Sequence, residues 1–176
     1  KLRQLRKQKE RLHGLSEFGA QLAQVNDVRT LCELAVQRVH QDMDYGVCSI
    51  CIADGMRLVY EAVAANEIFP SEEIPQKGAR GHIDGPGITR WAFRNAQPAI
   101  VRNVFEDERY DGARGVIRSF MAVPVIGRKG AIGVINVASE RLAAFDGQDV
   151  EVVSALASQI ATAISALRRG DSLTRI

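Results

Sequence analysis

The stretch RSFMAVPVIGRKGAIGVINVASE, residues 118–140, constrains the fold more than any other part of the sequence. Two apolar runs rich in β-branched residues are separated by a Gly-Arg-Lys-Gly turn at 127–130, the pattern of two antiparallel strands joined by a tight turn. Pro124 lies inside the first run, and because proline cannot donate to a sheet ladder it marks an edge, a bend or a bulge. Such irregularities often lie beside binding sites. We therefore expect the hairpin to be either scaffold or the wall of a pocket.

Helices are expected near both ends of the chain. Residues 1–26 have leucines at heptad-like spacing, and a second helix is predicted to begin at Asn26 or Asp27, either of which can cap it. A longer helix is predicted from Asp146 to about Arg169. Its buried stripe is Val150, Val153, Leu156, Ala157, Ile160, Ala161, Ile164 and Leu167.

The strands are joined by turns rather than by crossover helices, which predicts an α+β fold. The Asp54-Gly55 turn indicates a hairpin over residues 45–65, and residues 98–139 complete one antiparallel sheet of five or six strands. The N- and C-terminal helices are expected on one face of the sheet. We divide the chain into a linker or signalling helix (1–26), one domain (27–169) and the start of a linker or truncated output domain (170–176).

The other face of the sheet is expected to have an irregular cover. Residues 66–87 contain three prolines and four glycines, which predicts a long loop, and a short helix follows Gly87. A cavity is expected between the sheet and this loop and helix. We expect a small anionic or polar molecule there, because free N–H groups at the start of the short helix favour negative charge.

Charge and cysteine content limit the class of partner. The net charge is +2, and no apolar run approaches the roughly 18 residues of a membrane-spanning helix. We therefore expect neither nucleic acid nor direct membrane contact. Three cysteines are an odd and small number, which suits reduced thiols in a cytoplasmic protein.

Cys48 and Cys51 have the C-x-x-C spacing of a redox or zinc site. In a strand, positions three apart face opposite sides, so the two sulfurs cannot readily bind one metal. The chain has no second cysteine pair, and its histidines are scattered. We expect buried thiols, no metal and no cofactor.

Three segments in order, GPGITRWAFRNAQPAIVRNVFEDERY, RSFMAVPVIGRKGAIGVINVAS and FDGQDVEVVSALASQIATAI, resemble successive parts of a GAF domain. The resemblance covers roughly residues 27–168. It implies a regulatory sensor of bacterial signal transduction, which binds a small molecule and passes the signal along flanking helices. It also implies that Pro124 lies in a central strand on the pocket side. The alternative is a ligand-free dimerisation or spacer module, for example of a histidine kinase.

Other activities of the GAF family match these residues less well. His82 lies where some members ligate heme, and residues 66–118 lack the cysteine that anchors a bilin. The cyclic-nucleotide signature is matched at Asn136, Phe145 and Asp149, but its lysine is missing. Free methionine sulfoxide reductases carry working cysteines in the segments that match GPGITRW and YDGARGVIRSF, and both segments lack cysteine here. We therefore expect this chain not to be an enzyme.

In the sensor interpretation, the ligand contacts side chains of the sheet and the short helix. Trp91 and Met121 are residue types found more often in cores than in ligand sites, whereas a buried Arg118 would need an anionic or carbonyl partner. In the structural interpretation, the pocket is filled by its own side chains. The candidate ligand contacts are Trp91, Arg118, Ser119, Met121, Asn136 and Gly87.

The terminal helices have the a/d spacing of a two-helix seam, which predicts a parallel homodimer. The alternative is that Val153 and Ile160 face this domain's own sheet. The candidate interface residues are Leu5, Leu12, Val153, Ile160 and Leu167.

The chain ends in GDSLTRI, residues 170–176, which resembles the opening of a diguanylate cyclase (GGDEF) domain. The resemblance implies an output in cyclic-di-GMP signalling. A histidine kinase is the alternative output.

Overall fold

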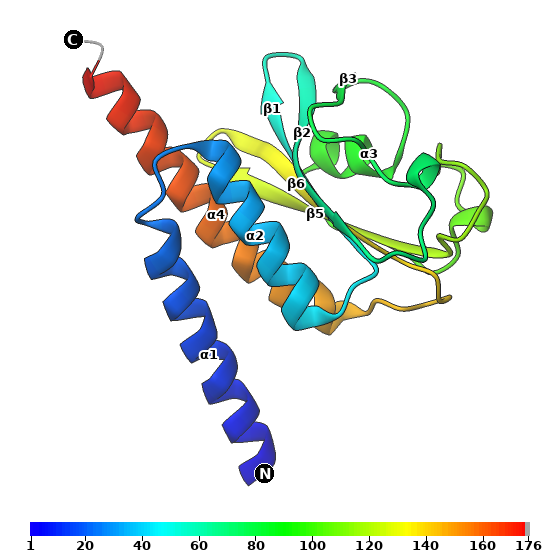
Figure 1. The fold of residues 1–176 in the computed structure, drawn as a ribbon, viewed down its shortest axis with the longest axis horizontal. Coiled ribbons are helices and arrows are strands. Elements are labelled where there is room, and N and C mark those ends of the chain that lie inside the picture. Colours follow the sequence, from blue (N-terminus) through cyan, green and yellow to red (C-terminus); the bar gives the residue numbers. More distant parts are fainter. Residues whose placement is uncertain (175–176) are drawn as a thin grey trace.

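One open antiparallel sheet organises the computed structural model, in the strand order β3-β2-β1-β6-β5-β4 (Figure 1). The structure describes the backbone of residues 1–174, and side chains except those of residues 8, 11, 12, 15 and 171–174. The predicted antiparallel α+β fold is confirmed. The strands are β1 (Val47–Asp54), β2 (Arg57–Ala65), β3 (Arg80–His82), β4 (Ala99–Val101), β5 (Ser119–Gly127) and β6 (Gly130–Ser139).

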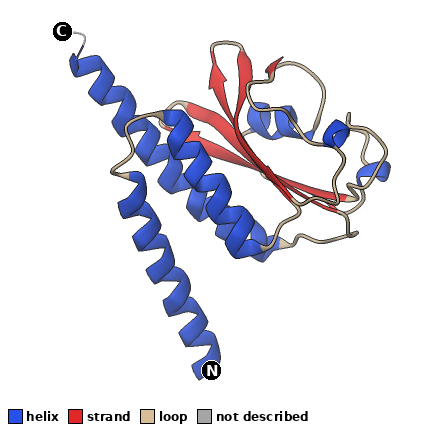
Figure 2. Ribbon diagram, in the orientation of Figure 1, coloured by secondary structure: helices blue, strands red, loops and turns tan. Residues whose placement is uncertain are grey.

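Two long helices, α2 (Val28–Met43) and α4 (Gly147–Thr174), cover one face of the sheet, and a third, α1 (Leu2–Leu22), contacts α4. One short helix, α3 (Ile88–Asn95), and loops cover the other face (Figure 2). We call residues 66–118, which include α3, β3 and β4, the cover. Two 3-10 turns, Ser71–Glu73 and Val104–Glu106, lie within it.

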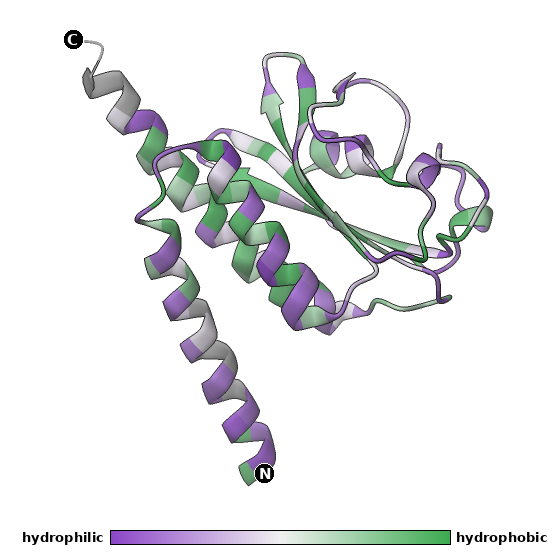
Figure 3. Ribbon diagram, in the orientation of Figure 1, coloured by the Kyte–Doolittle hydropathy of each residue, from purple (hydrophilic) through white to green (hydrophobic). Residues whose placement is uncertain are grey.

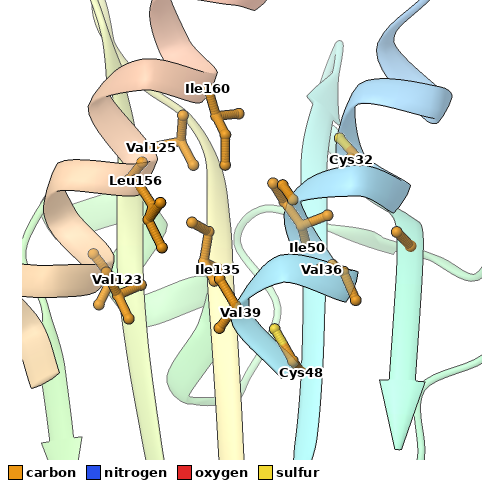
Figure 4. Close-up of a cluster of buried hydrophobic side chains, with 14 of the residues drawn as sticks. Cys32, Val36, Val39, Cys48, Ile50, Val123, Val125, Ile135, Leu156 and Ile160 are labelled. Carbon is orange, nitrogen blue, oxygen red and sulfur yellow. The ribbon is translucent and has the colours of Figure 1, made fainter. Parts of the chain in front are cut away.

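The core is divided by the sheet into two apolar clusters. The helix-side cluster fills the space between the sheet and the long helices, and its side chains interdigitate from α2, α4 and three central strands (Figure 4). It contains the stripes predicted from the sequence, including Leu31 on α2 and Ile160 on α4, both fully buried. The cover-side cluster lies on the opposite face and includes Ile88, Ala92 and Val134. Each fully buried aliphatic side chain contributes about 1.5–3 kcal/mol.

Acidic side chains fix the start of α2 and of α4. Asp27 caps α2, its carboxylate accepting a hydrogen bond from the Thr30 N–H at 2.8 Å. Asp149, in the first turn of α4, accepts the Tyr45 hydroxyl at 2.6 Å and the Asp146 N–H at 2.9 Å. Since Tyr45 lies just before β1, this pair ties the C-terminal helix to the first strand.

Helix α1 is only partly attached to the domain. Phe18 and Leu22, in its C-terminal half, are buried in the helix-side cluster. Its N-terminal half leaves the helical layer, carries mostly hydrophilic residues and leaves Leu5 exposed (Figures 1 and 3). The two chain ends point away from opposite ends of this layer (Figure 1).

The packing of α4 corrects part of the predicted dimer seam. Val153 and Ile160 are fully buried among this domain's own side chains, so they are not available to a partner helix. Leu167 packs at the edge of the same cluster, and the Leu12 side chain lies outside the described residues. By length and composition, Gly147–Gly170 would also suffice to cross a membrane, but its buried residues pack in the helix-side cluster.

Pro124 lies where β5 has one strand neighbour. It pairs with Val134 of β6, whereas β4 pairs only with Phe120–Ala122. A register irregularity follows at Val125/Ile126. Pro124 therefore lies beside a bulge, on the cover side of the sheet, but it is not among the residues that line the cavity described below.

Candidate functional site

A cavity of about 250 Å³ lies between the sheet and the cover. Side chains from four strands form its floor, and α3 together with two loop segments of the cover forms its walls. The residues that line it include Val47, Ser49, Tyr60, Phe120, Asn136 and Ala138 on the sheet, Ile88 and Thr89 on α3, and Glu72, Glu73, Ile74, Pro75, Tyr110, Asp111, Gly112 and Ile117 in the loops.

A chain of polar side chains crosses the floor of the cavity. The Thr89 hydroxyl donates to Asn136 Oδ1 at 2.8 Å, and Asn136 Nδ2 donates to Ser49 Oγ at 3.4 Å. These residues come from α3, β6 and β1, so the network also fixes the short helix on the sheet. Buried polar groups of this kind give a pocket its specificity for an oriented ligand.

Tyr60 faces the cavity because β2 contains one extra residue. Ile50 pairs with Ala62 and Cys51 pairs with Tyr60, so Glu61 has no partner on β1. Ala62 therefore joins the helix-side cluster while Tyr60 packs on the cover side. Burial raises the pKa of Tyr60 to about 12, so it is a neutral hydroxyl at physiological pH.

Glu73 holds two parts of the cover together. Its Oε1 accepts a hydrogen bond from the Ile117 N–H at 2.9 Å, across 44 residues of sequence. Its Oε2 is buried and has no hydrogen-bond partner among the described residues. The carboxylate lies against Gly115, where an added Cβ would be 2.5 Å from Glu73 Cδ. One acceptor of the cover is thus left unsatisfied.

Gly87 and Asp111 meet at the start of α3. Gly87 has φ +111°, a conformation that favours glycine, and an added Cβ would lie 2.7 Å from Asp111 Oδ1. Asp111 also pairs with Arg90 at 3.8 Å. The protein's own carboxylate therefore lies beside the helix N-terminus where the sequence led us to expect an anionic ligand.

Trp91 lies in the cover with an arginine over its ring. The Arg109 guanidinium is 4.5 Å from the ring centroid, and Asp107 holds it through two hydrogen bonds of 3.0 and 2.8 Å. Trp91 is half-buried and is not among the residues that line the cavity. It therefore stabilises the cover rather than the floor.

The structure separates the predicted ligand contacts. Asn136 lines the cavity and Gly87 starts α3 beside it. Ser119 and Met121 lie on the wrong face: Met121 is fully buried in the helix-side cluster, and Ser119 donates to the Arg141 carbonyl at 2.6 Å. Arg118 lies over the Phe105 ring at 4.8 Å, away from the cavity lining.

The cysteines and His82 are not among the residues that line the cavity, although Cys51 lies against the Asn136 side chain at its floor. Cys48 points into the helix-side cluster (Figure 4), whereas Cys51 belongs to the cover-side cluster, as their spacing predicted. Burial raises the pKa of both thiols to about 12. His82 is largely exposed on β3. Among the described residues, no group of three or more His, Cys, Asp or Glu could hold a metal ion.

Sequence reasoning missed Tyr60, Glu73 and Asp111. The bulge at Glu61 that turns Tyr60 to the cavity leaves no mark in the alternation of residue types. Glu73 and Asp111 lie in irregular segments, where sequence spacing does not determine side-chain direction. The three acidic residues of the lining, Glu72, Glu73 and Asp111, are a signal only once the fold has brought them together.

Solved structures of low sequence identity share this fold. One is a free methionine-R-sulfoxide reductase from Neisseria meningitidis in complex with its substrate (TM-score 0.76, 20% identity, 89% of each chain covered). Another is the GAF domain of an Acinetobacter phosphoenolpyruvate-protein phosphotransferase (TM-score 0.76, 19% identity, covering 90% of this chain and 94% of that one). A third comprises residues 122 to 287 of a methyl-accepting chemotaxis protein (TM-score 0.70, 20% identity, covering 85% and 96%).

The family assignment rests on a direct sequence match. The comparison with curated proteins gave no match. The family model described as "GAF domain" matches residues 25–165, most of the chain and the whole of the sheet. The chain therefore belongs to the GAF domain family.

Proposed function

We propose that this chain is the regulatory sensor domain of a signal-transduction protein. A small molecule binds in the cavity between the sheet and the cover. The conformational change that it causes is passed through α1 and α4 to an attached output domain. The observation that carries the proposal is a cavity whose floor holds connected polar groups, the buried Ser49 and Asn136 and the half-buried Thr89, with space left above them. A purely structural module would be expected to fill that space with apolar side chains.

Strand β5 supplies a route from the cavity to the helices. Phe120 lines the cavity, whereas the next residue, Met121, is buried in the helix-side cluster. Helix α4 packs on β5. A ligand that displaces Phe120 therefore also shifts the neighbouring Met121, whose side chain packs in the helix-side cluster. The shift reaches the helices because packed interiors transmit strain.

The rest of the signalling assembly belongs to the same proposal. We place the chain in the cytoplasm, as a homodimer through its flanking helices, followed by a diguanylate cyclase output. Helix α4 continues to Thr174, so the segment that resembles the cyclase opening starts inside a helix able to carry a rotation or shift onward. The last two residues of that segment lie outside the described residues.

The sulfoxide reductase among the similar structures suggests the rival function, an enzyme. Such chemistry needs a thiolate placed in the pocket. Of the three cysteines in the chain, none is among the residues that line the cavity. Burial keeps the Cys48 and Cys51 thiols protonated at neutral pH. These observations favour the regulatory function over the reductase.

Ligand binding is tested with the chain's single tryptophan, Trp91, as reporter. A metabolite panel is screened by thermal shift, and hits are titrated while Trp91 fluorescence is followed; a native mass spectrum of protein purified from its host supplies candidate ligands. We expect at least one saturable hit. Ser49→Leu, which fills the cavity from the floor, should abolish binding with the circular dichroism spectrum retained.

The matched control is Asn66→Ala, an exposed loop position outside the lining. It should bind the hit with wild-type affinity. Flat thermal shifts across the panel, together with no bound mass in the native spectrum, would support the ligand-free spacer instead.

A further inference from the structure

An open groove lies in the helical layer, on the opposite side of the sheet from the cavity. It has a volume of about 620 Å³ and lies where the N-terminal half of α1 leaves α2 and α4 (Figure 1). Its floor consists of the apolar side chains Met43, Val152, Ala155 and Leu156. Along the α1 wall, the lining residues are Lys7, Glu10 and Gly14. The chain's own α1 therefore offers this apolar floor little apolar cover.

Helix α1 has two apolar faces, and its own domain uses only one of them. Phe18 and Leu22 are four residues apart, so they share a face, and both are buried in the helix-side cluster. At 3.6 residues per turn, Leu2 and Leu5 lie roughly 140–160° around the helix from Phe18. They are 81% and 59% exposed. Because Phe18 holds α1 with these two leucines turned away from its own domain, their cover must come from another molecule.

Charge on the exposed face of α1 complements charge at the groove. Arg6 and Lys9 follow the two leucines by four residues each, so they share the leucine face. The first nine residues of the chain contain five basic residues and no acidic one. At the groove, Arg38 already pairs with Asp42. Glu151 lines the groove, is exposed on α4 and forms no ion pair with any described residue, so it is the acid available to a basic partner.

A second copy of the chain has both the leucines and the groove that each copy leaves uncovered. Helices α1 and α4 run in the same direction (Figure 1). A two-fold axis parallel to these helices would place the leucine face of each α1 over the groove of the other copy. In such a symmetric dimer the same contact forms twice, so one pairing covers both grooves and both helices.

We infer that the free half of α1 docks in the groove of a second copy, with Leu2 and Leu5 on the apolar floor and Arg6 and Lys9 beside Glu151. This inference rests on the homodimer of the proposed function and names the surfaces that form it. The dimer is an exchange of N-terminal arms. Because α4 supplies most of the floor, a shift of α4 in one copy acts directly on α1 of the other.

Charge reversals on the two sides of the contact test the exchange. Glu151→Arg changes only the groove, and the double variant Arg6→Glu, Lys9→Glu changes only the arm. Each variant alone places like charges at both symmetric contacts. Its dimer dissociation constant, measured by sedimentation velocity on the full chain, should rise about 5- to 30-fold. Circular dichroism melts establish that both variants are folded.

Mixing the two variants separates an exchange between copies from a contact within one chain. In a mixed dimer, the basic arm of the Glu151→Arg chain meets the acidic groove of the other chain, and the reversed arm meets the reversed groove. An equimolar mixture should therefore dimerise with nearly the wild-type dissociation constant. If α1 acted only on the groove of its own chain, mixing would restore nothing.

The matched control is the double variant Arg128→Glu, Lys129→Glu, which makes the same change at exposed positions of the β5–β6 turn, outside the groove. It should keep the wild-type dissociation constant.

The outcomes separate this inference from the proposed function. If neither groove nor arm variant weakens a wild-type dimer, or their mixture dimerises no better than either alone, the arm exchange is wrong while a dimer through other surfaces stands. A wild type that is monomeric at high micromolar concentration would overturn both the exchange and the proposed homodimer. Ligand binding in the cavity is measured independently by the metabolite panel.

Discussion

A thiol buried among apolar side chains keeps its proton far into the alkaline range. Burial raises the pKa of Cys48 and of Cys51 to about 12, compared with about 8.5 for an exposed thiol. Above pH 8.5 the unfolded chain therefore loses protons that the folded chain keeps. The free energy of unfolding falls by about 1.4 kcal/mol per pH unit for each such thiol until the folded-state pKa is reached.

Cys51→Ala tests this at a single residue. The change should lower the free energy of unfolding at pH 7 by about 1–2 kcal/mol through lost packing. Between pH 9 and 11 its stability should decline less steeply than that of the wild type, by about 1.4 kcal/mol per pH unit. Urea denaturation at pH 7, 9, 10 and 11 measures both effects. The control is Val134→Ala in the same cluster, which removes apolar volume but no proton; a wild-type slope in Cys51→Ala would contradict the prediction.

The sequence predicts which side chains of a strand share a face, but it predicts which face they occupy only where one set of alternate positions is apolar and the other is polar. The spacing of Cys48 and Cys51 alone predicts opposite faces, and this is confirmed. On β5 both sets of alternate positions are apolar, so the sequence did not show whether Phe120 or Met121 faces the cavity. The prediction for Ser119 and Met121 was wrong because a shift of one residue reverses every side chain of a strand.

At the scale of the element, β6 is built around one close contact. Gly133 pairs with Ile52 of β1, and an added Cβ would lie 2.4 Å from the Cys51 carbonyl oxygen. Gly133→Ala should therefore force the two central strands apart, at a cost of about 1–3 kcal/mol, and lower the Tm by several degrees. Thermal melts followed by circular dichroism measure this. Gly147→Ala, with nothing within 4 Å of the added Cβ, is the matched control and should leave the Tm unchanged or slightly raised.

Elements with a strong apolar period were predicted well, and the short helix after Gly87 was also predicted, but strand β3 was not. The stripes of α2 and α4 and the two hairpins appear where expected. Strand β3 was expected to be loop, because Arg80–His82 carries no apolar alternation and its pairing with Arg57–Val59 depends on the folded β2. In the cover, the contacts of Glu73 and Asp111 depend on tertiary structure in the same way.

At the scale of the whole molecule, the helical layer has an inner and an outer surface with different roles. Ile160 belongs to the inner surface and Leu5 to the outer one. Ile160→Glu should abolish the native circular dichroism spectrum, because burying an unpaired carboxylate costs several kcal/mol. Leu5→Glu should keep the wild-type Tm.

The predicted homodimer is tested on the same pair of variants. The wild type should sediment as a dimer, and Leu5→Glu should shift the sedimentation coefficient toward the monomer if the free half of α1 forms the seam. An unchanged coefficient in Leu5→Glu, or a monomeric wild type at high micromolar concentration, would remove the flanking-helix dimer. A folded Ile160→Glu would show that α4 packs less tightly than described.

The extra residue in β2 has a consequence for how this sequence tolerates length changes. Residues two apart in a regular strand face the same side of the sheet, but Tyr60 and Ala62 do not, because Glu61 between them has no partner on β1. Tyr60 faces the cover and Ala62 faces the helices. Deletion of Glu61 alone would make Tyr60 and Ala62 neighbours in a regular strand, where adjacent residues face opposite sides, so both halves of β2 would keep their present faces. Deletion of one residue elsewhere in β2 would instead reverse the faces of every residue on one side of the deletion, so Glu61 is the one position of this strand where the sheet tolerates the loss of a residue.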